Sequence, residues 1–196
     1  MANNVFISFR YSDGIKYKEE LSRKFENSND TLDFSEDEDR SKYTEETIRD
    51  FLYGKLRRSS VTIVLLTPNA INHEKNFLGQ YDDWMYDEIR YSLEDRENNR
   101  TNGLVAVYTP EAKSYLMYDS LHRCQNCGKT SVVKTIRSVD NLFRKNMMNI
   151  KESFKNNKCI GVYNGDLDSY CSLISYEDFI DNFDKYIRIA EEKIFK

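Results

Sequence analysis

The chain has 196 residues, 39% of them hydrophobic and 32% charged, and its net charge is −4. This length is typical of one compact domain. The densest run of charge is acidic, which argues against a nucleic-acid-binding protein. No apolar run approaches the roughly eighteen residues of a membrane-spanning helix, so we expect no membrane partner. The N-terminus lacks a basic segment followed by an apolar stretch, which favours a cytoplasmic protein.

The first third of the chain alternates short apolar runs with amphipathic segments. Residues 5–9 (VFISF) predict a strand buried on both faces, and residues 15–27 predict a helix. The short run TLDF predicts a second strand. After the acidic loop at 33–46, Thr44 can cap a helix that has Glu45 and Glu46 in its first turn.

Two β-branched and aliphatic runs, SVTIVLLTP and GLVAVYTP, each end at one of the two prolines and predict central strands. The helical stretch between them spans about residues 81–96. Strands that alternate with helices predict an α/β fold, with a mainly parallel sheet covered by helices on both faces.

The last part of the chain is less regular. We expect residues 111–169 to form an insertion before the last strand, with a strand at KCIGVY inside it. YCSLISY predicts the last strand. An amphipathic helix then closes a single domain that spans 1–196, and its core-facing residues are Phe179, Phe183, Ile187, Ala190 and Ile194.

Parallel α/β sheets bind ligands beyond the carboxyl ends of their strands. The segment SFRYSDG after the first strand is not the glycine-rich GxGxxG loop of dinucleotide-binding folds, and no GxxxxGK[ST] loop occurs. The third strand ends in LLTPN, which lacks the aspartate that a phosphorylated receiver domain needs there.

Four segments in order, VFISFR, LDFSED, VTIVLLTPNAI and DDWMYDEI, resemble the TIR domain family over about residues 5–96. The resemblance implies a flavodoxin-like three-layer sandwich with five parallel strands, and cleavage of NAD+ at the nicotinamide–ribose bond. The later part resembles stand-alone TIR-like proteins of bacterial antiphage defence, of the Thoeris type. That implies an NAD+ glycohydrolase or ADP-ribosyl cyclase whose cyclic ADP-ribose-type product activates a separate effector protein.

Glu88 is the candidate catalytic residue. Nicotinamide leaves NAD+ as a neutral molecule, so no general acid is needed, unlike in most glycosidases. One carboxylate can bind the ribose hydroxyls and stabilise the developing positive charge, an effect worth about 3–4 kcal/mol. Trp84 lies one helical turn before Glu88 on the same face, where an indole can line the pocket and hold the helix against the sheet.

Five further residues are candidates for substrate binding, with NAD+ as substrate and no separate cofactor. Arg10 can pair with the pyrophosphate, and Phe9 can stack on a ring. Ser8 and Ser35 follow strand ends and offer hydroxyl groups. Asp83 directly precedes Trp84, where it can also serve as a helix cap.

A zinc site is the alternative use of His122, Cys124 and Cys127, which supply three potential ligands. A closed structural site needs a fourth ligand, and neither Cys159 nor Cys171 forms a second CxxC pair. We therefore predict no metal, and reduced cysteines in a hairpin of the insertion.

Two rival functions remain open at this level. TIR domains also act as scaffolds that assemble with one another or with partner proteins, and a third possibility is a sensor that binds NAD+ without cleaving it. Constitutive loss of NAD+ is toxic, so an enzyme of this kind implies gating by self-association or by a phage-derived trigger.

Overall fold

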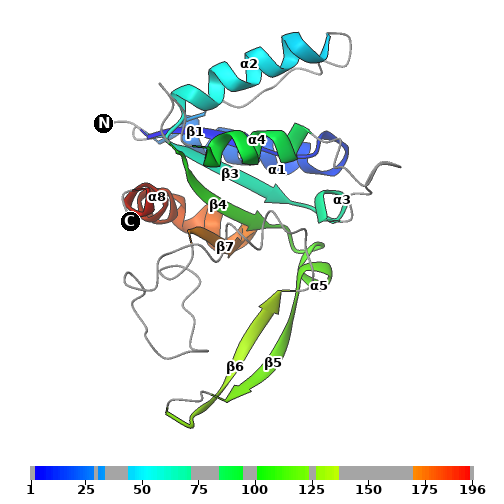
Figure 1. The fold of residues 1–196 in the computed structure, drawn as a ribbon, viewed down its shortest axis with the longest axis vertical. Helices are drawn as coiled ribbons and strands as arrows, with labels where there is room; N and C mark the ends of the chain where they lie inside the picture. The colour runs from blue at the N-terminus through cyan, green and yellow to red at the C-terminus, as the bar shows by residue number, and fades with distance from the viewer. Residues whose placement is uncertain are drawn as a thin grey trace.

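A computed structural model describes residues 3–28, 31–33, 44–71, 84–94, 101–123, 127–136 and 170–194. Its centre is a five-stranded sheet in the order β2-β1-β3-β4-β7, in which all neighbouring strands are parallel (Figure 1). The strands are β1 (Asn3–Ser8), β2 (Thr31–Asp33), β3 (Val61–Leu66), β4 (Gly103–Tyr108) and β7 (Cys171–Ser175). This order is that of flavodoxin-like folds and confirms the expected fold class.

Helices cover both faces of the sheet. Helices α2 and α4 lie on one face, and α1 and α8 pack on the other (Figure 1). The short helices α3 and α5 follow the carboxyl ends of β3 and β4. The helix bounds are α1 (Tyr11–Glu26), α2 (Glu45–Arg58), α3 (Pro68–Ile71), α4 (Trp84–Leu93), α5 (Lys113–Leu116) and α8 (Tyr176–Lys193).

Local sequence signals set where two of the long helices begin. The Thr44 hydroxyl accepts a hydrogen bond from the amide of Thr47 at the start of α2, as predicted. The Ser175 hydroxyl accepts one from the amide of Asp178 at the start of α8. Both caps satisfy amide groups that have no partner within the helix.

The first helix begins earlier than the sequence predicts, at Tyr11 instead of Ile15. The sequence pattern predicts that Gly14 belongs to the loop after β1, but Gly14 lies inside α1 and is buried. A Cβ atom at this position would lie 3.3 Å from the Phe9 side chain. Close packing of helix on strand, and not loop conformation, therefore explains this glycine.

The two faces of the sheet have different cores. On the α1 and α8 face the side chains that β1, β3 and β4 contribute to the core are apolar, as the alternation along these strands dictates. The buried polar contact on this face comes from β7, where the Ser172 hydroxyl accepts a hydrogen bond from Lys193 of α8 at 2.7 Å. On the α2 and α4 face apolar residues share the interior with buried hydroxyl and carboxyl groups. The core-facing residues predicted for the last helix are confirmed for Phe179, Phe183, Ile187 and Ala190, whereas Ile194 lies at its C-terminal cap.

An antiparallel hairpin extends away from the sheet domain (Figure 1). It consists of β5 (Met117–Arg123) and β6 (Thr130–Ile136), and Gly128 has the positive φ of 70° that its turn requires. The hairpin falls inside the expected insertion. The strand expected at 158–163 lies outside the described residues, and no described helix is long and apolar enough to cross a bilayer.

Candidate functional site

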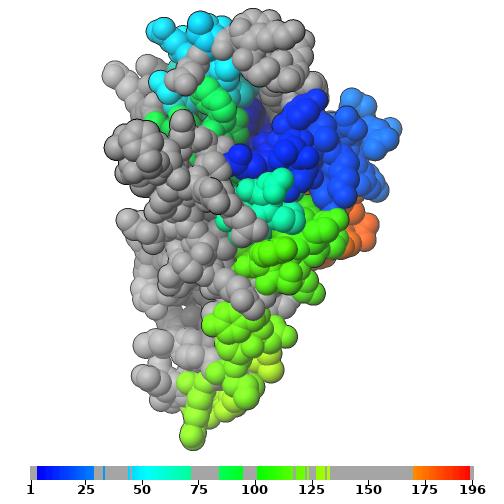
Figure 2. Space-filling model, turned by 90° about the vertical axis from the view of Figure 1, so that its right-hand side faces the viewer, coloured from blue at the N-terminus to red at the C-terminus, as the bar shows by residue number. Residues whose placement is uncertain are grey.

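The sheet has a topological switch point between β1 and β3. From β1 the chain adds β2 on one side, and then β3, β4 and β7 in turn on the other side. Ligands of flavodoxin-like folds bind beyond the carboxyl ends of the strands at such a point. Helix α1 starts directly after β1, and α3 starts directly after β3. In the space-filling view the start of α1, α3 and the turn after β4 lie side by side on one surface (Figure 2).

Two predicted site residues meet at this point. The Ser8 hydroxyl, at the end of β1, donates a hydrogen bond of 2.5 Å to Oε2 of Glu88 on α4. Ser8 is fully buried, and Glu88 is only 8% exposed. A carboxylate is rarely buried to this degree without hydrogen-bonding partners, so the contact stabilises its position. Glu88 is therefore not an ordinary surface charge of a helix.

Local geometry explains why Glu88 faces the sheet. Helix α4 buries Met85, Glu88, Ile89 and Ser92, which recur at the three- and four-residue spacing of one helix face. Ser8 follows Phe6 by two residues on β1, so it lies on the same α4 side of the sheet. In register it pairs with Val64, two residues before β3 ends.

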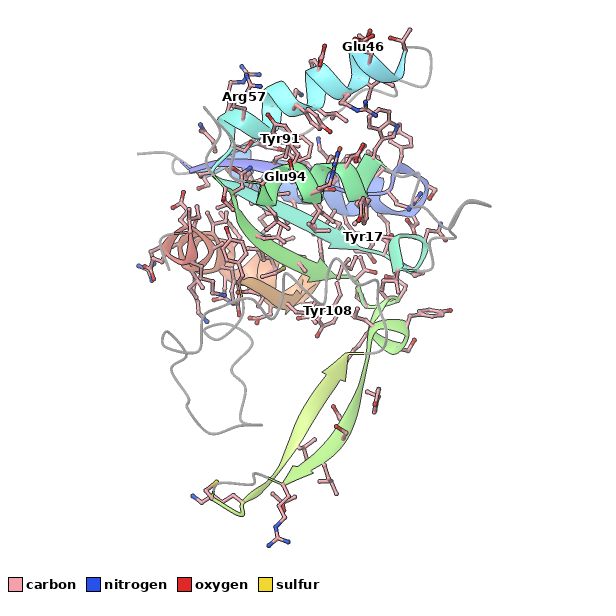
Figure 3. All side chains as sticks on the ribbon, viewed as in Figure 1. Tyr17, Glu46, Arg57, Tyr91, Glu94 and Tyr108 are labelled. Carbon is pink, nitrogen blue, oxygen red and sulfur yellow. The ribbon has the colours of Figure 1, made fainter. Side chains whose placement is uncertain are left out.

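Trp84 packs at the start of α4, and its predicted role in lining the binding site stays a prediction. Its side chain packs against the cluster formed by Phe6, Leu56 and Tyr91, at the junction of α4, α2 and β1. Figure 3 shows Tyr91 between α4 and α2, with Arg57 beside it. The guanidinium of Arg57 donates to the Tyr91 hydroxyl at 3.4 Å. The half of the prediction that assigned Trp84 to helix packing thus agrees with the structure.

Phe9 lies away from the Ser8–Glu88 pair, on the other face of the sheet. Phe9 packs against the apolar cluster of the α1 and α8 face, because neighbouring residues of a strand point to opposite faces. Arg10 is half-buried and occupies the N-terminal cap of α1. Both still lie at the carboxyl end of β1. Their predicted contacts with NAD+ remain predictions.

The other predicted positions are only partly described. Ser35 and Asp83 lie outside the described residues, as does Cys124. Cys127 is exposed in the turn of the hairpin, and the side chain of His122 is not among those described. Within the described part of the chain, no three His, Cys, Asp or Glu residues are placed to hold a metal ion.

The sequence analysis did not select Asp13, which connects α1 to the segment after β3 by hydrogen bonds. Its carboxylate accepts a hydrogen bond of 2.7 Å from the Thr67 hydroxyl and one of 2.9 Å from the amide of Asn69. Asp13 thereby links the first turn of α1 to the end of β3. One sequence signal could have pointed to this link. The Thr67-Pro68 pair follows β3 and leads into a helix, and the first amide groups of a helix need hydrogen-bond acceptors such as the Asp13 carboxylate.

A second link joins α1 to the turn after β4. The Tyr17 hydroxyl donates to Glu111 at 2.6 Å, and Lys16 lies 3.5 Å from the same carboxylate. The pKa of Glu111 is lowered to about 2, chiefly by the hydrogen bond from Tyr17, with smaller contributions from backbone and Thr109 hydrogen bonds and from the charge of Lys16. The carboxylate is therefore charged at any physiological pH and fixes the turn that follows β4.

Buried hydroxyl and amide groups lie beneath Glu88 on the same face. Ser92 donates to the backbone oxygen of Glu88 at 2.7 Å, and its hydroxyl lies 2.8 Å from that of Thr62 on β3. The side-chain amide of Asn102 donates to Thr62 at 3.3 Å. These bonds tie the helix that carries Glu88 to the central strands.

The comparison with protein families agrees with this architecture. Residues 6–114 match the family model described as Thoeris protein ThsB, TIR-like domain, which is more than half of the chain. The chain belongs to this ThsB TIR-like family. The match confirms the TIR resemblance of the four sequence motifs and suggests a role in antiphage defence. It includes Ser8 and Glu88, and it ends three residues before the hairpin begins.

Proposed function

We propose that this ThsB-like protein cleaves NAD+ and releases nicotinamide, with Glu88 as the catalytic carboxylate. One observation carries the proposal: Glu88 is buried at the switch point of a TIR-like sheet and accepts a short hydrogen bond from Ser8. A carboxylate that is buried near the ligand-binding edge of an α/β sheet is a candidate for a functional group. Family membership supports the same reaction class.

In the proposed reaction Glu88 acts electrostatically. The C1′–N bond of the ribose breaks, nicotinamide takes both bonding electrons, and its ring nitrogen becomes neutral. The charge that develops on the ribose is stabilised by the Glu88 carboxylate, which also accepts hydrogen bonds from the ribose hydroxyls. Ser8 is the positioning residue in this scheme, because its hydroxyl directs one carboxylate oxygen.

The product is a second part of the proposal. A hydroxyl or adenine nitrogen of the same molecule, held against C1′ while water is excluded, gives a cyclic ADP-ribose-type product. Attack by water gives linear ADP-ribose. Because the family suggests a defence role, we infer that the cyclic product reaches a separate effector protein as a diffusible signal.

The test compares wild type with Glu88→Gln and Ser8→Ala. Each protein is incubated with NAD+, with and without extract of phage-infected cells, and products are identified by mass spectrometry. We expect Glu88→Gln to lower the rate of nicotinamide release by about 100-fold to 1,000-fold. Ser8→Ala removes only the positioning bond, so its loss is expected to be smaller, about 10-fold.

Glu94→Gln is the matched control, because Glu94 lies just after the same helix and is partly exposed. This variant should retain wild-type turnover. If linear ADP-ribose is the sole product, the proposed NAD+ cleavage is supported and the proposed cyclase reaction is refuted. Intact NAD+ under both conditions refutes the enzyme and favours a TIR scaffold that acts by protein assembly.

A further inference from the structure

The hairpin β5–β6 carries an exposed apolar pair outside the sheet domain. Leu121 and Val132 lie directly opposite each other across the two strands. They are 77% and 67% exposed, the highest values among the large hydrophobic side chains that the structure describes. Strand β5 lies at the lower end of the molecule in Figure 2. An isolated two-stranded hairpin is marginally stable in water, so an uncovered apolar pair on it favours a contact.

Opposite charges flank this pair at equal distances. Asp119 and Arg123 stand two residues before and two residues after Leu121, so all three side chains share one face of β5. Both charged residues are exposed. They are about 13 Å apart along the strand, too far to form an ion pair with each other within one chain. In the register of the hairpin, Lys134 on β6 lies opposite Asp119, and Thr130 lies opposite Arg123.

This pattern is self-complementary under a two-fold axis that crosses the strands. When two such faces stack in opposite directions, Leu121 meets Leu121 and Val132 meets Val132 of the second copy. Asp119 of each copy then faces Arg123 of the other, which gives two ion pairs. A nucleic acid would be repelled by Asp119 at one end of this face and attracted by Arg123 at the other, so it matches the pattern less well than a second copy does.

We propose that this hairpin face, formed by Asp119, Leu121, Arg123 and Val132, is a contact between two copies of the chain. The copies run in opposite directions, which places the two sheet domains at opposite ends of the pair. Domains on the same side would collide, because stacked sheets lie only about 10 Å apart whereas each domain has three layers. The contact is isologous, as in most homodimers.

The size of the face sets the expected strength. Stable interfaces bury about 1,600 Å² in total, and a single hairpin face offers less. The contact is therefore weak and depends on protein concentration. It lies outside residues 6–114, so it belongs to the part of this chain that the family match does not cover.

Sedimentation velocity from low micromolar to millimolar protein tests the apolar part. Wild type is expected to shift from monomer to dimer, and Leu121→Asp is expected to weaken the dimer by at least about 10-fold. Tyr118→Asp is the matched control, since Tyr118 is an exposed residue on the opposite face of β5. A wild type that stays monomeric, or a dimer unchanged by Leu121→Asp, overturns the proposal.

A charge exchange tests the arrangement of the copies. Asp119→Arg and Arg123→Asp are each expected to weaken the dimer by about 3-fold to 10-fold, and the double variant should restore it. If Asp119→Arg weakens the dimer only by disturbing its own hairpin, the double variant carries the same disturbance and stays weak. Recovery of the dimer in the double variant therefore indicates contacts between the two copies. Failure of the double variant to recover excludes this arrangement.

Two measurements keep these outcomes independent of folding and of catalysis. Each variant is checked for wild-type thermal unfolding, which the sheet domain dominates. Glu88→Gln should dimerise like wild type, because Glu88 is buried in the sheet domain. Loss of nicotinamide release with normal dimers, or the reverse, separates a failure of the proposed function from a failure of this contact.

Discussion

The same strands present different kinds of side chain to the two faces of the central sheet. On the α1 and α8 face, β1, β3 and β4 contribute only apolar side chains to the core. On the α2 and α4 face the same strands contribute Ser8 and Thr62 as well, and both hydroxyls bond to groups on α4. The first face holds the fold together, whereas the second also positions Glu88.

The difference has an energetic cost. A buried polar group is tolerated only when it is hydrogen-bonded, so each hydroxyl on the α4 face needs a defined partner. Apolar packing has no such requirement and depends on shape alone. On the α1 and α8 face, apolar substitutions should therefore act through volume and an added hydroxyl should lack a partner. On the α4 face, loss of a hydroxyl should act through hydrogen bonding.

The largest effect on stability is expected from Gly103→Ala, at the start of β4. A Cβ atom there would lie 2.6 Å from the backbone oxygen of Ala190, so α8 has to move away from the sheet. Overpacking of this kind costs about 3 kcal/mol, which lowers the melting temperature by roughly 6–12 °C. Thermal unfolding followed by circular dichroism measures the shift.

Gly54→Ala is the control for this experiment. Gly54 lies inside α2, and the Cβ that alanine would add meets no atom within 4 Å beyond the adjacent residues and backbone of its own helix. Alanine is the better helix former, so this variant should be about 0.5–1 kcal/mol more stable than wild type. Equal destabilisation of the two variants would refute the assignment of Gly103 to close packing of α8.

A reciprocal pair of isosteric substitutions tests the contrast between the faces. Thr62→Val removes the bonds to Ser92 and Asn102, and should cost about 1–2 kcal/mol. Val61→Thr places a hydroxyl in the apolar cluster of the other face, and should cost about 1–3 kcal/mol. Urea unfolding measures both losses. A gain in stability for Thr62→Val would mean that the polar groups reduce stability overall.

The strands and long helices were predictable from sequence because each has a local signal. Uninterrupted aliphatic runs marked β3 and β4, and a capping threonine marked α2. The start of α1 was missed because Gly14 is a helix breaker by propensity, and its reason for being there lies in Phe9, which only the folded chain brings close.

The candidate site was predictable to a smaller extent. Glu88 and Ser8 were both chosen, but the bond between them joins residues 80 positions apart, and no local pattern encodes it. Phe9 was placed with them because it is adjacent in sequence, although strand alternation turns it to the other face. Asp13 was missed because its partners, Thr67 and Asn69, come from another element.

The smallest effect is expected from Tyr17→Phe, which cuts the link between α1 and the turn after β4. The variant keeps the ring that packs edge-on against Tyr176 at 4.7 Å but removes the hydrogen bond to Glu111. Because Glu111 is exposed to solvent, the loss should stay below about 1 kcal/mol. Tyr115→Phe, at an exposed tyrosine of α5, is the matched control and should change nothing.

The pH dependence of this small loss identifies its cause. The pKa of Glu111 is lowered from 4.5 to about 2 in the folded protein. A depressed carboxyl pKa stabilises the fold fully above the unfolded value, and that stabilisation disappears as pH falls through the folded value. The difference in unfolding free energy between wild type and Tyr17→Phe should therefore be constant above pH 4.5 and shrink steadily towards pH 2. A difference that persists undiminished through this range would assign the effect to packing of the Tyr17 ring instead of to the charge of Glu111.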